Sequence, residues 1–294
     1  MRKTVRNIIL GFILLLGMAL GITALLAKPI PSHPFFESAA DVMVMAHRGG
    51  RYLWPENTLF AFENATALGV DVLEMDLRST RDGAIVVLHD DTVDRTMDGS
   101  GPVLEYTLEE LKSLDAAYHW SPDDGQTYPL RGQGIVIPTL EEVLAAFPDM
   151  QMNIEIKQSE PSIVASVCDL IREHGAVERV LVASFDSDTI RAFRETCPEV
   201  ASTAGESEVR LLYGLSVIYL GGLYRPQAEA VQVPEYSGGI HVVTQRFIDA
   251  AHRRGMDVHV WTVNEADDIQ RMLDLGVDGI ITDAPDLLLQ MLGR

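Results

Sequence analysis

Cysteine is nearly absent from this sequence, which contains only Cys168 and Cys197 among 294 residues. The two lie far apart and lack the close spacing of cysteine-ligated metal sites, so a zinc centre of that kind is excluded. In an exported domain they could form a disulfide. Buried free thiols are at least equally consistent with the pattern, because unpaired cysteine behaves as a small hydrophobic residue.

Basic residues are also scarce, with 23 Lys and Arg against 43 Asp and Glu and a net charge of −20. Residues 1–28 hold four of the basic residues and no acidic one, so the remaining chain carries a net charge of −24. Such a domain is repelled by nucleic acid and by anionic lipid headgroups, and we expect no nucleic-acid partner. The same acidity suits a site that holds a divalent cation.

Charge is completely missing from residues 8–27, an apolar run of twenty residues. A helix of this length spans ~30 Å, enough to cross the hydrocarbon core of a bilayer. Basic residues lie mainly before the run, which predicts a cytoplasmic N-terminus and an extracytoplasmic remainder. We therefore expect a single-pass membrane anchor over residues 1–28 and a stiff, proline-rich linker over residues 29–40.

A cleaved signal peptide is the alternative interpretation of the same run. The apolar core of a signal peptide is usually only ~7–15 residues long and ends in a small-x-small cleavage site. Cleavage after Ala27 would place Leu25 where a small residue is required. We therefore favour an uncleaved anchor.

Residues 41–294 have the length of one α/β barrel domain. Short apolar segments with strand character alternate with segments of helical spacing along most of this length. Eight such strands are what a closed (β/α)8 barrel of the TIM type needs, and a ninth would form an arm beside the second strand. The expected barrel strands cover residues 42–46, 72–77, 152–157, 180–184, 200–203, 228–233, 257–263 and 279–282, and the arm covers residues 84–88.

The first expected strand ends in His47 and Arg48, which are followed by two glycines. In α/β barrels the C-terminal ends of the strands carry the chemistry. Glycine lets the backbone approach a ligand closely, and the planar guanidinium of arginine matches a phosphate group. This strand end is therefore a candidate phosphate-binding site.

Two further strand ends carry carboxylates. Glu74 and Asp76 share one face of the second strand, because successive side chains alternate between faces. An exposed sheet face is the alternative, but their apolar neighbours favour a buried strand, where a cation between the two carboxylates is the better explanation. Glu155 and Lys157 share a face of the third strand; a local ion pair is the alternative, but we expect a third metal ligand and a phosphate-binding lysine.

A second histidine is expected beside these carboxylates. The turn at residues 81–83 is too short for a parallel crossover, so the arm must pair antiparallel with the second strand. This pairing brings His89 level with Glu74 and Asp76. The irregular residues 91–138 then predict an insertion that covers the site.

One later segment does not fit an ordinary outer helix. Residues 211–223 carry no charge and are apolar nearly all round, although an outer barrel helix should show a polar face. The segment is too short to span a membrane. Either another part of the chain, such as the insertion, covers it, or it contacts lipid.

Six short motifs occur in the order found in a known enzyme family. They are His47-Arg48-Gly49, Pro55-Glu56-Asn57-Thr58, Glu74-Met75-Asp76, His89-Asp90, Glu155-Ile156-Lys157, and Trp261-Thr262-Val263-Asn264 together with residues 278–283. With these motifs the chain resembles the glycerophosphodiester phosphodiesterase family over about residues 42–285. The resemblance implies an α/β barrel with an insertion after the second histidine. It also implies metal-dependent hydrolysis of glycerophosphodiesters to an alcohol and glycerol 3-phosphate.

The resemblance also implies a role for each matching residue. It makes Glu74, Asp76 and Glu155 metal ligands, and this all-oxygen ligand set favours Mg²⁺ or Ca²⁺. His47 and His89 would be the acid/base pair, and the attacking group would be either a glycerol hydroxyl of the substrate or water. The implied phosphate ligands are Arg48 and Lys157, and the further site or pocket residues are Glu56, Phe185 and Trp261.

Two departures from the family pattern leave alternatives open. Residues 51–54 widen the loop before Pro55 with two aromatic residues, and residues 211–223 are unusually apolar. Both allow hydrolysis of a lysophospholipid at the membrane. A catalytically inactive, membrane-anchored binding barrel is a second alternative, although retention of the histidines and carboxylates argues against it.

Overall fold

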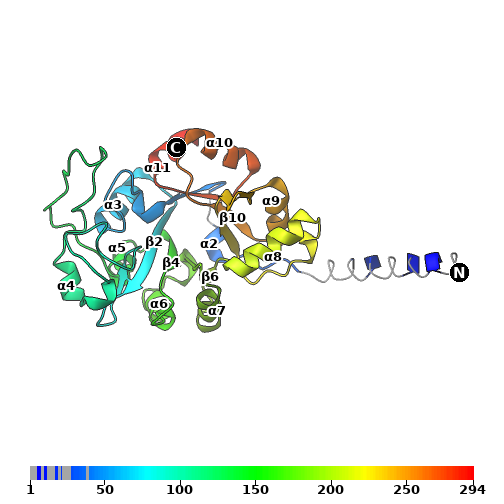
Figure 1. Ribbon diagram of the computed structural model, residues 1–294, viewed down its shortest axis with the longest axis horizontal. Coiled ribbons are helices and arrows are strands. Elements are labelled where there is room, and N and C mark those ends of the chain that lie inside the picture. Colours follow the sequence, from blue (N-terminus) through cyan, green and yellow to red (C-terminus); the bar gives the residue numbers. More distant parts are fainter. Residues whose placement is uncertain (1–4, 8–9, 12–16, 19–20, 22–27, 38–39) are drawn as a thin grey trace.

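The computed structural model describes residues 5–7, 10–11, 17–18, 21, 28–37 and 40–294. Its main sheet contains eight parallel strands in chain order, and the last strand pairs with the first. Figure 1 shows the strands in the interior of the domain with helices around them. A bridge between Thr203 and Ala230 spans the remaining gap, which gives the predicted (β/α)8 barrel. The strands are β1 (Met43–Ala46), β2 (Val72–Ser79), β4 (Gln151–Ile156), β5 (Val180–Ala183), β6 (Ala201–Ser202), β7 (Ala230–Val233), β10 (Asp257–Val260) and β11 (Gly279–Thr282).

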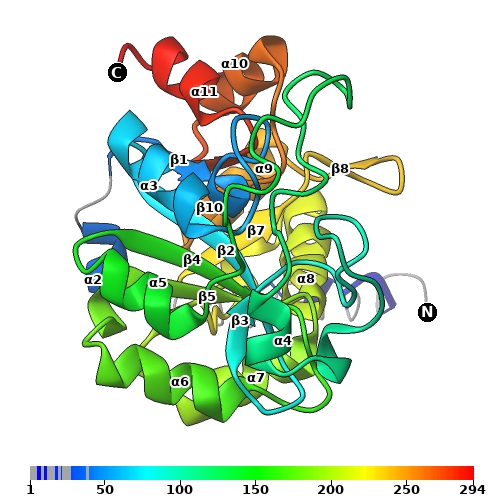
Figure 2. The same ribbon diagram turned by 90° about the vertical axis from the view of Figure 1, so that its left-hand side faces the viewer.

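Helices surround these strands (Figure 2). Thr58 and Thr139 cap the first two of them, because their side chains accept hydrogen bonds from the backbone N–H groups of Ala61 and Glu142. The outer helices are α3 (Leu59–Leu68), α5 (Leu140–Ala146), α6 (Val164–Glu173), α7 (Ser187–Thr196), α8 (Glu206–Val217), α9 (Gln245–His252), α10 (Ala266–Leu275) and α11 (Pro285–Met291). Short 3-10 helices are η1 (His47–Gly49), η2 (Val103–Glu105), η3 (Val177–Arg179) and η4 (Gly221–Leu223).

The arm pairs as predicted, and the residues after it form an irregular insertion, but no residue of 91–138 lines the cavity that it was expected to cover. Strand β3 (Ile85–Val87) pairs antiparallel with β2, and the N–H of Leu88 donates to the carbonyl of Asp76 at 2.9 Å. The insertion that follows contains η2 and α4 (Leu108–Lys112) and has its own apolar cluster. Trp120 of the insertion donates to the carbonyl of Arg51 at 3.4 Å, so the insertion contacts the loop after β1.

Part of the expected linker is packed against the barrel. Phe35 in α2 (Pro34–Glu37) is fully buried among residues at the beginnings of the strands, such as Met43 and Val72. The N–H of Ile30 donates to the carbonyl of Arg254 at 2.8 Å. The N-terminal end of the barrel needs an apolar cover, and α2 provides it.

The expected membrane anchor falls mostly outside the described residues. Among the residues that the structure does describe, no helix is long and apolar enough to cross a membrane. The anchor over residues 1–28 therefore stays a prediction.

The apolar segment 211–223 forms the end of α8, η4 and the turn between them. Leu212 is buried, but Leu211, Val217, Ile218 and Tyr219 are 46% to 74% exposed, so the insertion does not cover this side of the segment. A two-stranded hairpin that we did not predict, β8 (Tyr236–Ser237) and β9 (Ile240–His241), also exposes apolar side chains.

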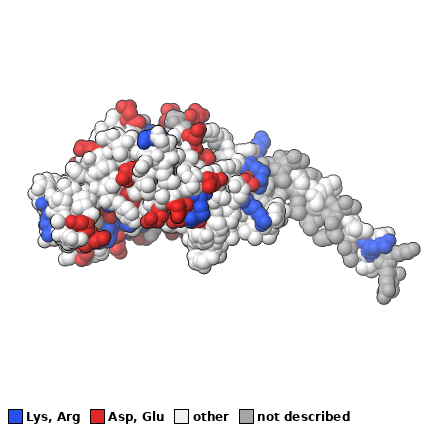
Figure 3. Space-filling model, turned by 90° about the horizontal axis from the view of Figure 1, so that it is seen from above, with Lys and Arg blue, Asp and Glu red and all other residues white. Residues whose placement is uncertain are grey.

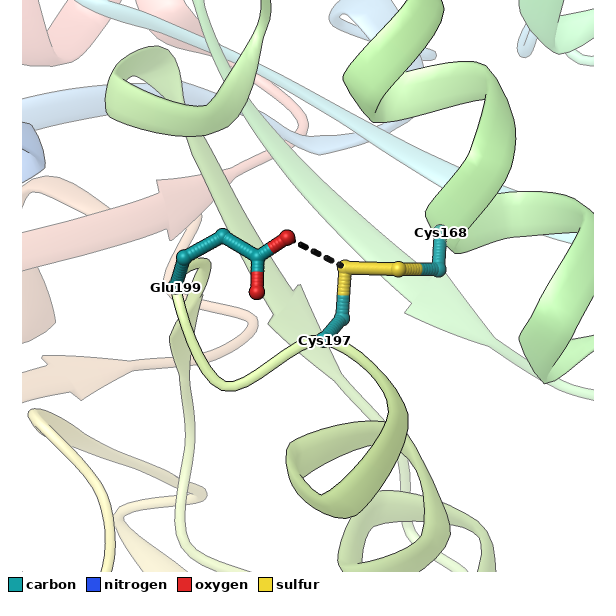
Figure 4. A group of neighbouring side chains, drawn as sticks. All are labelled: Cys168, Cys197 and Glu199. Atoms are coloured by element: carbon teal, nitrogen blue, oxygen red, sulfur yellow. Dashed lines mark hydrogen bonds between the residues drawn. A yellow bond between two sulfur atoms is a disulfide. The ribbon is translucent and has the colours of Figure 1, made fainter.

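Cys168 of α6 and Cys197 form a disulfide, with their Cα atoms 5.9 Å apart (Figure 4). Of the two alternatives left open by the sequence, the structure therefore contains the disulfide. Glu199 lies beside the bridge, but disulfide sulfurs are not thiolates, so this group does not form a metal site.

Acidic side chains are spread over the surface of the barrel domain that Figure 3 shows. This distribution agrees with the excess of Asp and Glu in the sequence. A negatively charged ligand must therefore be held by cations inside a site rather than by the general field of the domain.

Candidate active site

A cavity of about 700 Å³ opens at the C-terminal ends of the strands. Six of the ten site residues expected from the sequence line its inner part, namely His47, Arg48, Glu74, His89, Glu155 and Lys157. Phe185 and Trp261 line its wall. Asp76 and Glu56 lie behind this lining and contact Arg48.

The turn after β1 has an unusual backbone conformation that directs His47 and Arg48 toward the cavity. Arg48 has a left-handed φ of 53°, and Gly49 has a φ of 84°. A Cβ atom at Gly49 would lie 2.8 Å from the Cβ of Ala61, so only glycine allows α3 to pack this closely. The turn also directs the N–H of Arg48 to Glu74 Oε2 at 2.7 Å.

Three carboxylates meet at the inner end of the cavity. Glu74, Asp76 and Glu155 each offer an oxygen, and these oxygens all lie within 4.8 Å of one another. β2 and β4 pair in a register that sets Asp76 beside Glu155, which explains why carboxylates so distant in sequence converge. Burial and the charge of Asp76 raise the pKa of Glu74 to about 7, as expected for like charges held together.

The carboxylate cluster fits a hard divalent cation. Asp76 Oδ1 and Glu155 Oε1 are buried and have no hydrogen-bond partner among the described residues. Buried carboxylate oxygens are normally hydrogen-bonded or bound to a cation. An acidic site of oxygen ligands is the type that Mg²⁺ and Ca²⁺ occupy in proteins.

Two cationic side chains face the same cluster. Lys157 Nζ lies 2.6 Å from Glu155 and 3.3 Å from Asp76, and Arg48 Nε lies 3.3 Å from Asp76. Despite its burial, the pKa of Asp76 is lowered because both cations face it. The Glu155–Lys157 ion pair is therefore real, but it is largely buried and belongs to this cluster rather than to an exposed surface.

His47 has a fixed hydrogen-bond partner. Its Nδ1 lies 2.6 Å from Asp283 Oδ1, and a carboxylate can only accept, so Nδ1 donates and Nε2 remains for the cavity. Burial lowers the pKa of His47, but the charge of Glu74 and the hydrogen bond to Asp283 outweigh it, so the pKa is raised. Asp283 is itself held by Asn264 at 2.8 Å and by Arg51 at 3.0 Å.

His89 is oriented in the same way by its neighbour in sequence. Its Nδ1 lies 2.6 Å from Asp90 Oδ1, which again leaves Nε2 for the cavity. Burial is the largest influence on this ring, and its pKa is lowered. Two histidines of opposite pKa shift thus line one cavity.

The outer part of the cavity is mainly apolar. Phe185 and Trp261 pack edge to face with ring centroids 5.2 Å apart, and Lys157 Nζ lies 5.4 Å from the Phe185 ring. Another part of the lining comes from α8 and from the segment around the β8–β9 hairpin. It includes Val209, Tyr213, Ile240 and Val242.

Several residues of the site were not predicted as such. Asn57 donates to Asp76 at 3.0 Å, Asp283 and Asp90 orient the histidines, and Arg95 binds Glu56. Asp283 directly follows the last strand, and a position at the C-terminal end of a barrel strand indicates a residue of the site. Arg95 lies within the irregular insertion, where no periodic pattern in the sequence predicts which way a side chain points.

This α/β barrel, with an acidic cation site, two cations and two carboxylate-held histidines at one end, has the architecture of a barrel phosphodiesterase. The Glycerophosphoryl diester phosphodiesterase family matches residues 47–287. A glycerophosphodiester phosphodiesterase of Caldanaerobacter subterraneus subsp. tengcongensis is 35% identical over 261 residues, covering 86% of this chain and 98% of the relative. A probable glycerophosphodiester phosphodiesterase 2 of Mycobacterium tuberculosis is 36% identical over 257 residues, covering 85% and 90%.

Solved structures agree with these relatives. A putative glycerophosphoryl diester phosphodiesterase from Silicibacter pomeroyi has a TM-score of 0.72 and 28% identity, covering 89% of this chain and 97% of that chain. A phosphodiesterase from Oleispira antarctica, solved with the product sn-glycerol-3-phosphate, has a TM-score of 0.70 and 25% identity, covering 85% and 96%. The chain belongs to the glycerophosphodiester phosphodiesterase family. It is a phosphoric diester hydrolase that acts on glycerophosphodiesters.

Proposed function

We propose that this cavity hydrolyses glycerophosphodiesters to an alcohol and glycerol 3-phosphate with a divalent cation held by Glu74, Asp76 and Glu155. The observation that carries this assignment is a three-carboxylate cluster in which one buried oxygen of Asp76 and one of Glu155 accept no hydrogen bond. A cation bound there would offset the negative charge of the diester and polarise a P–O bond. Mg²⁺ and Ca²⁺ both suit these ligands.

Arg48 and Lys157 are the proposed ligands of the substrate phosphate. Their charged groups lie beside the carboxylate cluster, so an anionic phosphate bound to them would also face the cation. Glu56 supports this arrangement, because it accepts a hydrogen bond from Arg48 Nη1 at 2.9 Å.

His47 and His89 are the proposed proton-transfer pair. Each presents Nε2 to the cavity because its Nδ1 is held by a carboxylate. One of them in the neutral form accepts the proton of the nucleophile, and the other in the protonated form donates to the leaving oxygen. The nucleophile is either a glycerol hydroxyl of the substrate or water.

The metal assignment is tested by titrating Mg²⁺ and Ca²⁺ into the protein by calorimetry. Glu155→Gln removes one ligand charge and should weaken binding of the preferred ion at least 10-fold, with a parallel loss of turnover. Glu160→Gln, a change of the same kind in the loop that follows β4 and outside the cluster, is the matched control. Equal affinity of the Glu155→Gln variant and the wild-type protein would refute the ligand set.

A lysophospholipid is a second candidate substrate because of the apolar wall of the cavity. An acyl chain could lie against Tyr213 and Ile240, and Ile240 is 51% exposed at this wall. Ile240→Glu should then reduce kcat/KM for lysophosphatidylcholine but leave glycerophosphocholine unaffected, with Leu104→Glu on the insertion as the control. Equal effects on both substrates, or no hydrolysis of the lysolipid, would exclude this activity.

The compartment is proposed from two observations. The apolar run over residues 8–27 is long enough for an anchor, and the Cys168–Cys197 disulfide is typical of proteins outside the cytoplasm. We therefore place the barrel on the extracytoplasmic side of a membrane. Protease added to intact spheroplasts should digest it; complete protection would refute this location, and a mature protein beginning near Lys28 would refute the anchor.

A further inference from the structure

Arg95 of the insertion connects two carboxylates of the site. Its Nε donates to Asp90 Oδ2 at 2.6 Å, and its Nη1 and Nη2 donate to the two oxygens of Glu56 at 2.7 and 2.8 Å. One guanidinium therefore makes three short, charge-assisted hydrogen bonds with two acceptors. Such bonds are stronger and more directional than neutral ones.

Each of these carboxylates uses its remaining capacity on a residue of the cavity. Asp90 Oδ1 holds His89 Nδ1 at 2.6 Å, and Glu56 Oε1 accepts from Arg48 Nη1 at 2.9 Å. The chain of contacts thus runs from His89 through Asp90, Arg95 and Glu56 to Arg48. Arg95 itself does not line the cavity.

The charge balance of this series of contacts depends on Arg95. Glu56 and Asp90 are two anions that approach the same guanidinium, and without it they would repel each other. Although burial opposes ionisation, the hydrogen bonds from Arg95 lower the pKa of Glu56, and those from Arg95 and His89 lower the pKa of Asp90 to about 2. An ionised Asp90 is the acceptor that keeps the His89 proton on Nδ1.

We propose that Arg95 is a positioning residue that fixes the orientation and tautomer of His89 and, through Glu56, the orientation of Arg48. This inference rests on the proposed role of His89 in proton transfer. Lysine cannot replace arginine here, because a single ammonium group lacks the planar fork that reaches both carboxylates.

The competing explanation is that Arg95 only fastens the insertion to the barrel. Its neighbours Val93 and Met97 are already fully buried in the apolar cluster of the insertion. Arg81 also fastens the insertion, through the carbonyl of Glu105 at 2.7 Å and the carboxylate of Glu110 at 3.0 Å, but it has no connection to the site. Arg81→Ala is therefore a matched control for a purely structural effect.

The test measures kcat of the full chain on glycerophosphocholine for Arg95→Ala, Arg95→Lys and Arg81→Ala, each in the wild-type and His89→Ala backgrounds. Arg95→Ala should lower kcat about 10- to 100-fold and Arg95→Lys nearly as much, while Arg81→Ala stays within about 2-fold. In the His89→Ala background, Arg95→Ala should cost no more than about 3-fold, because its main target is gone. Added guanidinium ions should restore part of the activity of Arg95→Ala, because the wild-type Arg95 side chain is 44% exposed and its place is open to solvent.

Two results would overturn the inference. One is an Arg95→Ala enzyme within about 3-fold of Arg81→Ala in kcat. The other is the same fractional loss in both backgrounds, which would mean that Arg95 acts independently of His89. A His89→Ala enzyme with near wild-type kcat would refute the role of His89, and the inference with it.

Discussion

At the scale of single residues, both histidines of the cavity are held through Nδ1 by a carboxylate, but the two carboxylates come from different parts of the sequence. His47 is held by Asp283, which follows the last strand, whereas His89 is held by the next residue in the chain, Asp90. Both hydrogen bonds leave Nε2 directed to the cavity. A neutral and a protonated imidazole can therefore act on one substrate from two strand ends.

This arrangement predicts that each histidine is needed for turnover. His47→Ala and His89→Ala should each lower kcat by ~10²–10⁴-fold, the usual loss for a general acid or base. Thermal unfolding should show that both variants fold normally. If both kept near wild-type kcat, the proton-transfer assignment would be wrong.

A second residue-scale prediction concerns stability at the opposite end of the barrel. Burial and the nearby charge of Asp278 raise the pKa of Asp257 to about 7. The unfolded value is about 4, so protonated Asp257 stabilises the fold fully below that pH, and this contribution is lost as pH rises to about 7. Asp257→Asn should therefore raise the Tm by a few degrees at pH 8 and by little or nothing near pH 4. An equal change at both pH values would contradict the raised pKa.

At the scale of elements, the strand ends explain how much of the site could be predicted. Residues that end parallel strands of one barrel must meet at the same end, so the convergence of His47, Glu74 and Glu155 follows from the sequence pattern alone. The antiparallel arm placed His89 there by the same geometrical reasoning.

Other contacts could not be predicted, for physical reasons. The hydrogen bonds of Arg95 and of Asp283 join segments that are distant in sequence and carry no periodic signal. The burial of Phe35 depends on the open end of a barrel that exists only after folding. The β8–β9 hairpin consists of two-residue strands, too short for an alternating pattern.

The disulfide gives an element-scale prediction, because it joins α6 to the segment after α7. Cys168→Ala combined with Cys197→Ala should lower the free energy of unfolding by about 2–4 kcal/mol, since the bridge restricts the unfolded chain. The comparison is denaturant unfolding of this variant and of the wild-type protein without reductant. A variant as stable as the oxidised wild-type protein would show that the bridge contributes nothing.

At the scale of the whole molecule, the two ends of the barrel have separate tasks. Helix α2 closes the N-terminal end, and the cavity opens at the other end. A membrane anchor before residue 28 would therefore join the domain at the end remote from the cavity. Ile218 and Tyr219, which directly follow α8, are exposed apolar residues, and the proposed contact with lipid would use them.

The measurement that tests the account most directly is the release of glycerol 3-phosphate from glycerophosphocholine by the full chain, before and after complete removal of divalent metal. Chelation should abolish release, and added Mg²⁺ or Ca²⁺ should restore it in the wild-type protein. Glu155→Gln should respond far more weakly to the same addition. Undiminished release from the metal-free protein would contradict the central claim.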